Sequence, residues 1–199
     1  MNDPQTVSLL TILLSAALTD NILLTRFLGM CPFLAVSRQM KSAVGLGLAV
    51  TFVTTCTCAI NAILYHHVLV PLELAGGLQL IVFIIVIAAF VQLIEMLVER
   101  LSIGLYYALG IFLPLITVNC AILGTSLFMV NKDYTVTQSL VFGFGSGLGW
   151  MLAIVLMAGI RERLKKAQVP PGLEGPGISL IITGIMALGF IGFSGMIQQ

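Results

Sequence analysis

Charged residues are scarce in this chain. Only 9% of its 199 residues are Asp, Glu, Lys or Arg, and 59% are hydrophobic. A soluble domain carries about 25% charged residues, so this composition excludes one and predicts an integral membrane protein. Histidine occurs only as the pair His66-His67. The sequence therefore contains no Ser/His/Asp catalytic set and no metalloprotease helix motif. The few basic residues fit membrane topology and predict no nucleic-acid partner.

Six apolar segments are each about long enough to cross a bilayer, which takes roughly 20 residues. They are Val7–Met30, which runs on through a cysteine motif, Ser42–Leu64, Leu78–Val98, Ile103–Val130, Ser139–Ile160 and Ile178–Met196. We therefore predict an all-α integral membrane protein with a single membrane domain over residues 1–199. The first segment lacks the basic flank and cleavage site of a signal peptide, so we expect it to be retained.

Two stretches of the chain resemble each other. Cys31-Pro-Phe-Leu-Ala-Val-Ser37 and Cys120-Ala-Ile-Leu-Gly-Thr-Ser126 both fit Cys-x-x-Leu-(Ala/Gly)-x-Ser. Each lies in an apolar run interrupted by Gly and Pro, which is typical of broken helices that meet inside a bilayer. Since each half has three spans, the pattern predicts two inverted three-helix repeats, residues 1–102 and 103–199.

Proline predicts where the first and fourth helices break. Pro32 disfavours helical geometry at Cys31, and Pro114 has no N–H and clashes with the carbonyl of Gly110. Both predicted breaks therefore lie near a cysteine.

Basic residues are distributed unevenly between the two sides of the membrane. The first, third and fifth connections carry seven Lys or Arg residues, whereas the opposite side carries only Lys132. The positive-inside rule then places both termini in the periplasm and the Arg161–Lys166 loop in the cytoplasm.

The cysteines are the candidate metal ligands. Thiolate is a soft ligand suited to iron–sulfur clusters, zinc or copper(I), and two symmetry-related thiols, Cys31 and Cys120, suggest half of a four-thiolate site. The alternative is that both pack as small hydrophobic residues. Cys56 and Cys58 point about 200° apart on a helix, so we predict a structural role for them.

Ionisable residues within spans are candidates for an ion pathway. Asp20 and Glu95 are the two carboxylates concerned, and Asp20 has an alternative role as the partner of Arg26 in a buried ion pair. The run Gly143-x-Gly145-x-Gly147-x-Gly149 follows no strand, so it predicts close helix packing and not a nucleotide-binding loop.

Three stretches resemble the NqrE/RnfA family, the small six-helix membrane subunits of bacterial ion-pumping NADH:quinone (Nqr) and ferredoxin:NAD (Rnf) oxidoreductases. They are Thr25–Ser37, Ala108–Cys120 and Ala158–Arg163. Residues 143–155 and 182–195 look more like the NqrE branch. Thr25-Arg26-Phe27 and Cys31-Pro32 look more like the RnfA branch. The chain as a whole resembles NqrE most, and an RnfA subunit of the ferredoxin:NAD complex is the alternative.

The resemblance implies a bacterial inner-membrane location and a homologous, NqrD-like partner. In the family each partner contributes two broken-helix cysteines to one [2Fe-2S] cluster, and Cys31 and Cys120 occupy those ligand positions. The implied electron route runs from NADH through FAD on NqrF and this cluster to the covalent flavin on NqrC. Further flavins, FMN and riboflavin among them, lie on other subunits; NqrB passes electrons to ubiquinone, and NqrA completes the complex.

The implied function is that of a translocase subunit that relays electrons between flavins and couples their transfer to sodium export. We expect no catalysis from the isolated chain. Two other classes stay open: an inverted-repeat ion transporter without a redox centre, and a structural scaffold for a redox complex. An electron-free transporter would not need the cysteine pair.

Overall fold

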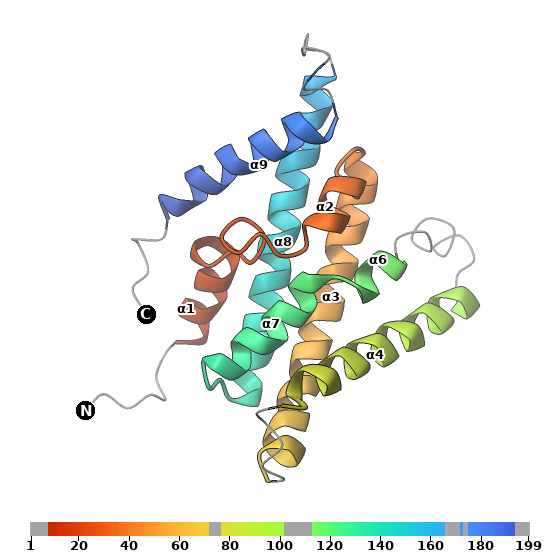
Figure 1. Cartoon of the computed structure of the whole chain (residues 1–199), viewed down its shortest axis with the longest axis vertical. Coiled ribbons are helices and arrows are strands. Elements are labelled where there is room, and N and C mark those ends of the chain that lie inside the picture. The colour runs from red at the N-terminus through yellow and green to blue at the C-terminus, as the bar shows by residue number, and fades with distance from the viewer. Residues whose placement is uncertain (1–7, 72–76, 102–112, 166–171, 173–174, 194–199) are drawn as a thin grey trace.

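The computed structural model describes residues 8–71, 77–101, 113–165, 172 and 175–193 of the chain. Every regular element in these residues is helical (Figure 1). The elements are α1 (Leu9–Leu14), η1 (Ser15–Thr19), α2 (Met30–Val36), α3 (Met40–Leu64), η2 (Tyr65–Leu69), α4 (Gln79–Leu101), α6 (Leu113–Thr117), α7 (Cys120–Asn131), α8 (Val136–Leu164) and α9 (Pro176–Ile191). The all-helical prediction is confirmed, and the division into two inverted repeats stays a prediction.

Four helical segments of the described chain are long and apolar enough to cross a membrane. They are Met40–Leu69, Gln79–Leu97, Pro114–Asn131 and Val136–Leu164. The segments Leu9–Thr19 and Pro176–Ile191 are apolar but shorter. In the described part of Val7–Met30, the segment predicted to contain a broken helix, the chain leaves the helix at Asp20 and re-enters one only at Met30.

Helices α3 and α8 form the centre of the molecule, and the glycine run lets them approach closely. A Cβ atom added to Gly147 would lie 2.6 Å from the Cα of Thr51 on α3. One added to Gly149 would lie 2.7 Å from the carbonyl oxygen of Ala17 on η1. Alternate glycines of the run therefore pack against two different elements, α3 and the first helix. The packing role predicted from its spacing is confirmed.

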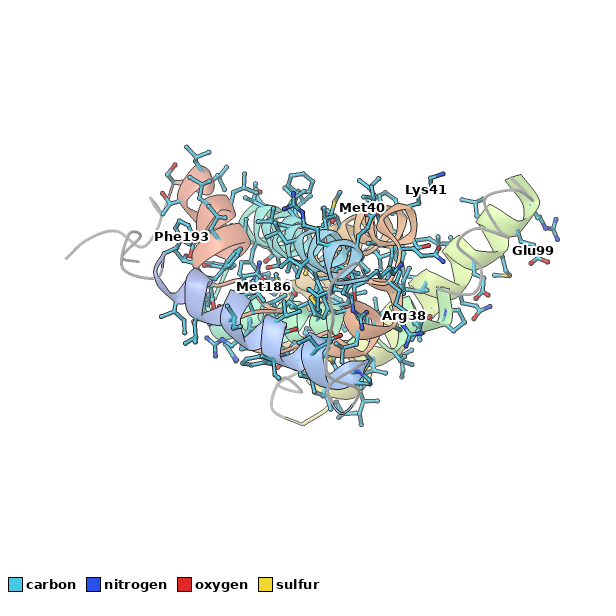
Figure 2. The ribbon with its side chains drawn as sticks, turned by 90° about the horizontal axis from the view of Figure 1, so that it is seen from above. Arg38, Met40, Lys41, Glu99, Met186 and Phe193 are labelled. Carbon is cyan, nitrogen blue, oxygen red and sulfur yellow. The ribbon has the colours of Figure 1, made fainter. Side chains whose placement is uncertain are left out.

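Helices α3 and α8 run in opposite directions, so the chain segments that flank them meet at both ends of the pair. At one end, Lys165 Nζ donates a hydrogen bond to the Arg38 carbonyl oxygen over 3.2 Å. At the other end, His66 Nε2 lies 3.2 Å from the carbonyl oxygen of Tyr134. Figure 2 looks onto the first of these ends, where Arg38 and Lys41 are labelled. Assigning this end to the cytoplasm stays a prediction from the charge bias.

Candidate functional site

A buried asparagine supports the first helix break. Asn21 lies between η1 and α2 and is fully buried. Its Nδ2 donates to the carbonyl oxygen of Gly149 over 2.8 Å. Its Oδ1 accepts from the backbone N–H groups of Leu23 and Leu24, at 3.1 and 3.3 Å. One amide therefore satisfies backbone groups that have left the helix, in a region where lipid offers no partner.

A second asparagine supports the other break, between α6 and α7. Asn119 is the N-cap of α7, and its Oδ1 accepts from the N–H of Ala121 over 3.0 Å. Cys120 is the first residue of the helix that this cap begins. Sequence reasoning assigned no role to either asparagine. The available signal was an N-capping residue type inside an otherwise apolar run.

Both prolines lie inside helices and not at the breaks themselves. Pro32 is the third residue of α2, and Pro114 is the second residue of α6 as described. The prediction that Cys31 is kept out of helical geometry was wrong. In the first turn of a helix the missing N–H of proline has no intrahelical partner to lose. The carbonyl of Gly110 lies outside the described residues.

Gly29 joins the two cysteine motifs. Its backbone N–H donates a hydrogen bond to Cys120 Sγ over 2.9 Å, and Cys31 follows two residues later. Gly29 has φ +81°, in the left-handed region that favours glycine. An added Cβ would lie 2.6 Å from Trp150 Nε1 and 2.9 Å from Asn119 Oδ1. Glycine is thus required here by backbone conformation and by space, and it brings together segments 91 residues apart.

The cysteines that begin the two motifs are accessible from outside the bundle. Cys31 and Cys120 are both exposed, and each lies in the first turn of a helix. Backbone N–H groups in a first turn favour negative charge such as that of a thiolate. Within the described residues no group of three or more His, Cys, Asp or Glu side chains could hold a metal ion. A ligand role for Cys31 and Cys120 stays a prediction.

Comparison with known proteins decides the family. The model of the Rnf-Nqr subunit family, described as a membrane protein, matches residues 9–197. The chain belongs to this family. It is 53% identical to the E subunit of the Na(+)-translocating NADH-quinone reductase of Marinobacter nauticus, 54% to that of Serratia proteamaculans and 52% to that of Proteus mirabilis. Each alignment covers 94% of this chain and 97% of the relative.

Membership in the Rnf-Nqr family confirms the resemblance drawn from the sequence. It also agrees with an all-helical membrane fold and with the predicted association with ion transport and electron transport. The family match by itself assigns no role to a particular residue, so the ligand role of Cys31 and Cys120 stays a prediction.

The other two cysteines of this Rnf-Nqr chain lie on α3, outside both cysteine motifs. Cys58 is fully buried on α3, where a Cβ on Gly143 would lie 2.8 Å from its own Cβ. Its Sγ lies 3.9 Å from Ser126 Oγ. Cys56 is half-buried. The structure thus gives Cys58 a packing environment, as expected of a structural cysteine.

The two candidate ion-pathway carboxylates lie in different parts of the molecule. Asp20 Oδ1 is 3.6 Å from Arg26 Nε, the pairing considered from the sequence, and its Oδ2 is 3.2 Å from Lys132 Nζ, which sequence reasoning missed. Glu95 is half-buried on α4, on the opposite side of the bundle from α1 in Figure 1. The structure does not bring the two carboxylates together, and an ion-pathway role for either stays a prediction.

Proposed function

We propose that this Rnf-Nqr chain is the E subunit of a Na(+)-translocating NADH:quinone reductase. In this proposal Cys31 and Cys120 bind one [2Fe-2S] cluster jointly with two cysteines of a homologous, NqrD-like subunit. The assignment comes from relatives that are 52–54% identical over nearly the whole chain. The cluster comes from the geometry of the cysteines.

One observation carries the cluster proposal. The only two cysteines that follow a helix break in the described chain are the two exposed ones, and Gly29 ties their segments together through its hydrogen bond to Cys120 Sγ. Two exposed thiols at helix breaks form only half of the ligand set of an all-cysteine [2Fe-2S] cluster, which takes four thiolates. A matching face on a second subunit would cover them and complete the ligand set.

The residues present fit such a cluster. An all-cysteine [2Fe-2S] cluster takes four thiolates, and this chain would supply two from its exposed cysteines. The Gly29 N–H donates to the sulfur of Cys120, and hydrogen bonds to ligand sulfurs are among the features that set the reduction potential of iron–sulfur proteins. Bound there, the cluster supplies one-electron transfer within a hydrocarbon core about 30 Å thick.

The wider role follows from the relatives and stays part of the proposal. The complex, in a bacterial inner membrane, transfers electrons from NADH through flavins on other subunits to ubiquinone, and this subunit relays them between two of those flavins. Sodium export accompanies the transfer. A change of charge at Cys31 and Cys120 would bias the bundle between conformations that differ in ion access.

The test is a cysteine series in the purified complex. Cys31→Ser and Cys120→Ser should each remove the electron paramagnetic resonance signal of the membrane cluster and stop electron transfer to quinone. Cys56→Ser is the matched control, because this half-buried residue lies on α3, outside both cysteine motifs, and it should keep the signal. A full signal in Cys31→Ser refutes the proposal. Sodium transport by an iron-free complex would instead favour the transporter without a redox centre.

The shared ligand set predicts that the isolated chain cannot hold the cluster. Expressed alone, the chain should purify without iron, and co-expression with its homologous partner should restore iron and acid-labile sulfide. A stable monomer that contains a complete two-iron cluster would contradict the shared site while leaving the assignment to the reductase intact.

A further inference from the structure

Each cysteine motif ends in a buried serine, and both serines are held in the same way. Ser37 and Ser126 are fully buried. Arg161 Nη1 donates to Ser37 Oγ over 2.8 Å, and Asn61 Nδ2 donates to Ser126 Oγ over 3.0 Å. We call these contacts the Ser37 clamp and the Ser126 clamp. In each clamp a polar side chain on a long helix holds the last residue of a cysteine motif.

The two clamps cross between the halves of the sequence. Ser37 belongs to the first half and is held from α8, in the second half. Ser126 belongs to the second half and is held from α3, in the first half. The closely packed α3–α8 pair therefore carries one donor for each motif. Incidental surface contacts would not be expected to show such a matched arrangement.

Arg161 does more than hold one hydroxyl group. Its Nη1 also donates to the Leu34 carbonyl oxygen over 2.9 Å, and its Nη2 donates to Ser179 Oγ on α9 over 2.6 Å. The carbonyl groups of the last helical turn have no partner within the helix, and a cation near that end is favourable. A single guanidinium thus fixes the carboxyl end of α2 to both α8 and α9.

This contact matters for Cys31 because α2 is short. The helix has seven residues, with Cys31 in its first turn. A helix of this length is not stable by itself, since helix nucleation is costly and few hydrogen bonds offset it. Its position depends on what holds its ends, namely Gly29 at one end and Arg161 at the other. A shift at the Arg161 end would be passed along this short helix to the sulfur of Cys31.

We propose that Arg161 and Asn61 are positioning residues that fix Cys31 and Cys120 through these two clamps. The inference rests on the proposed cluster and adds residues that touch neither iron nor sulfur. The Ser37 clamp is the stronger requirement, because α7 has twelve residues and its own asparagine cap, whereas α2 has neither. Supporting residues around metal ligands typically contribute about 10–100-fold to metal affinity.

The experiment uses the complete, co-expressed complex. Ser37→Ala and Arg161→Gln are compared with Arg163→Gln, an exposed arginine one half-turn along the same helix. Four properties are measured: the electron paramagnetic resonance spectrum, the midpoint potential of the cluster, the rate of iron loss to a chelator, and hydrogen exchange in residues 30–37. A purely structural role elsewhere in the bundle would leave the spectrum and the midpoint potential unchanged.

We expect both clamp variants to change the cluster spectrum and midpoint potential, to lose iron about 10-fold faster or more, and to exchange amide hydrogens of α2 faster. Arg161→Lys should restore part of the effect because it keeps the charge but loses the fork of donors. Arg163→Gln should match the wild type. Asn61→Ala should give a smaller change than Arg161→Gln.

The outcomes separate this inference from the proposed function. A wild-type complex without any cluster signal refutes the proposed function. A cluster that depends on Cys31 but keeps its spectrum, potential and iron in Ser37→Ala refutes the clamp alone. Should Arg161→Gln fail to assemble, Ser37→Ala decides the matter, since it removes a single hydroxyl group from a buried position.

Discussion

Gly29 offers the most direct test of the geometry at the cysteine node. In Gly29→Ala the alanine would have to keep the left-handed backbone conformation of Gly29. That conformation costs roughly 1–2 kcal/mol for a residue with a Cβ. The added carbon would also lie 2.6 Å from Trp150 Nε1 and 2.9 Å from both Ala121 Cβ and Asn119 Oδ1. Forcing an extra carbon into a well-packed interior costs about 1–3 kcal/mol.

These two costs are independent, so the substitution should destabilise the protein by on the order of 2–5 kcal/mol. Domains are stabilised by only about 5–15 kcal/mol, so a loss of this size is large. The strain also has a specific location. Relieving it requires Gly29 to move away from Asn119 and Trp150, which would lengthen the hydrogen bond from its N–H to Cys120 Sγ.

The assay is thermal denaturation of the purified complex, followed together with the cluster signal. Gly29→Ala should lower the denaturation midpoint and reduce the cluster content. The matched control is Gly189→Ala on α9, where an added Cβ meets open space. This variant should be neutral or slightly stabilising, because alanine is favoured over glycine in a helix by about 1 kcal/mol. If Gly29→Ala and Gly189→Ala have the same denaturation midpoint and the same cluster content, the contacts described around Gly29 are wrong.

Three further substitutions test other parts of the structure. Asp20→Asn should lower the denaturation midpoint slightly and leave electron transfer intact, since half-exposed ion pairs contribute about 0.2–1 kcal/mol each. Loss of sodium transport in an equally stable complex would instead assign Asp20 to the ion path. Gly147→Val should weaken α3–α8 packing by at least about 1–3 kcal/mol, because its Cβ would lie 2.6 Å from the Cα of Thr51; an unchanged midpoint would contradict that contact. For topology, an impermeant thiol reagent applied to intact cells should label His67→Cys and not Lys165→Cys, and the reverse pattern would invert the assignment.

Local sequence patterns predicted those features of the site that depend on spacing. The matched cysteine motifs indicated that Cys31 and Cys120 belong to equivalent broken helices. The glycine run indicated a close helix contact; the division of its glycines between α3 and the first helix is seen only in the structure. In each case the information lies within a few residues, where helical periodicity relates sequence directly to geometry.

The supporting contacts could not be predicted, because they join residues far apart in sequence. Arg161 was counted as one charge of a basic cytoplasmic loop, yet its guanidinium reaches Ser37, 124 residues earlier in the chain. Lys132 was likewise counted only as the basic residue of the opposite side, and it contacts Asp20. Long side chains of Lys and Arg extend far from their backbone position, so their partners depend on tertiary packing that no local pattern encodes.

The clamps also account for the form of the repeated motif. Cysteine begins Cys-x-x-Leu-(Ala/Gly)-x-Ser and serine ends it, about one and a half helical turns later at 3.6 residues per turn. The cysteine that begins each motif is exposed, and the serine that ends it is buried against the long helix of the other half. Because the clamps cross, the serine of each motif is held by a long helix of the other half of the chain. Under the proposed ligand role, the positions of Cys31 and Cys120 would depend on the α3–α8 contact, and the glycines of α8 that allow this contact would be part of their support.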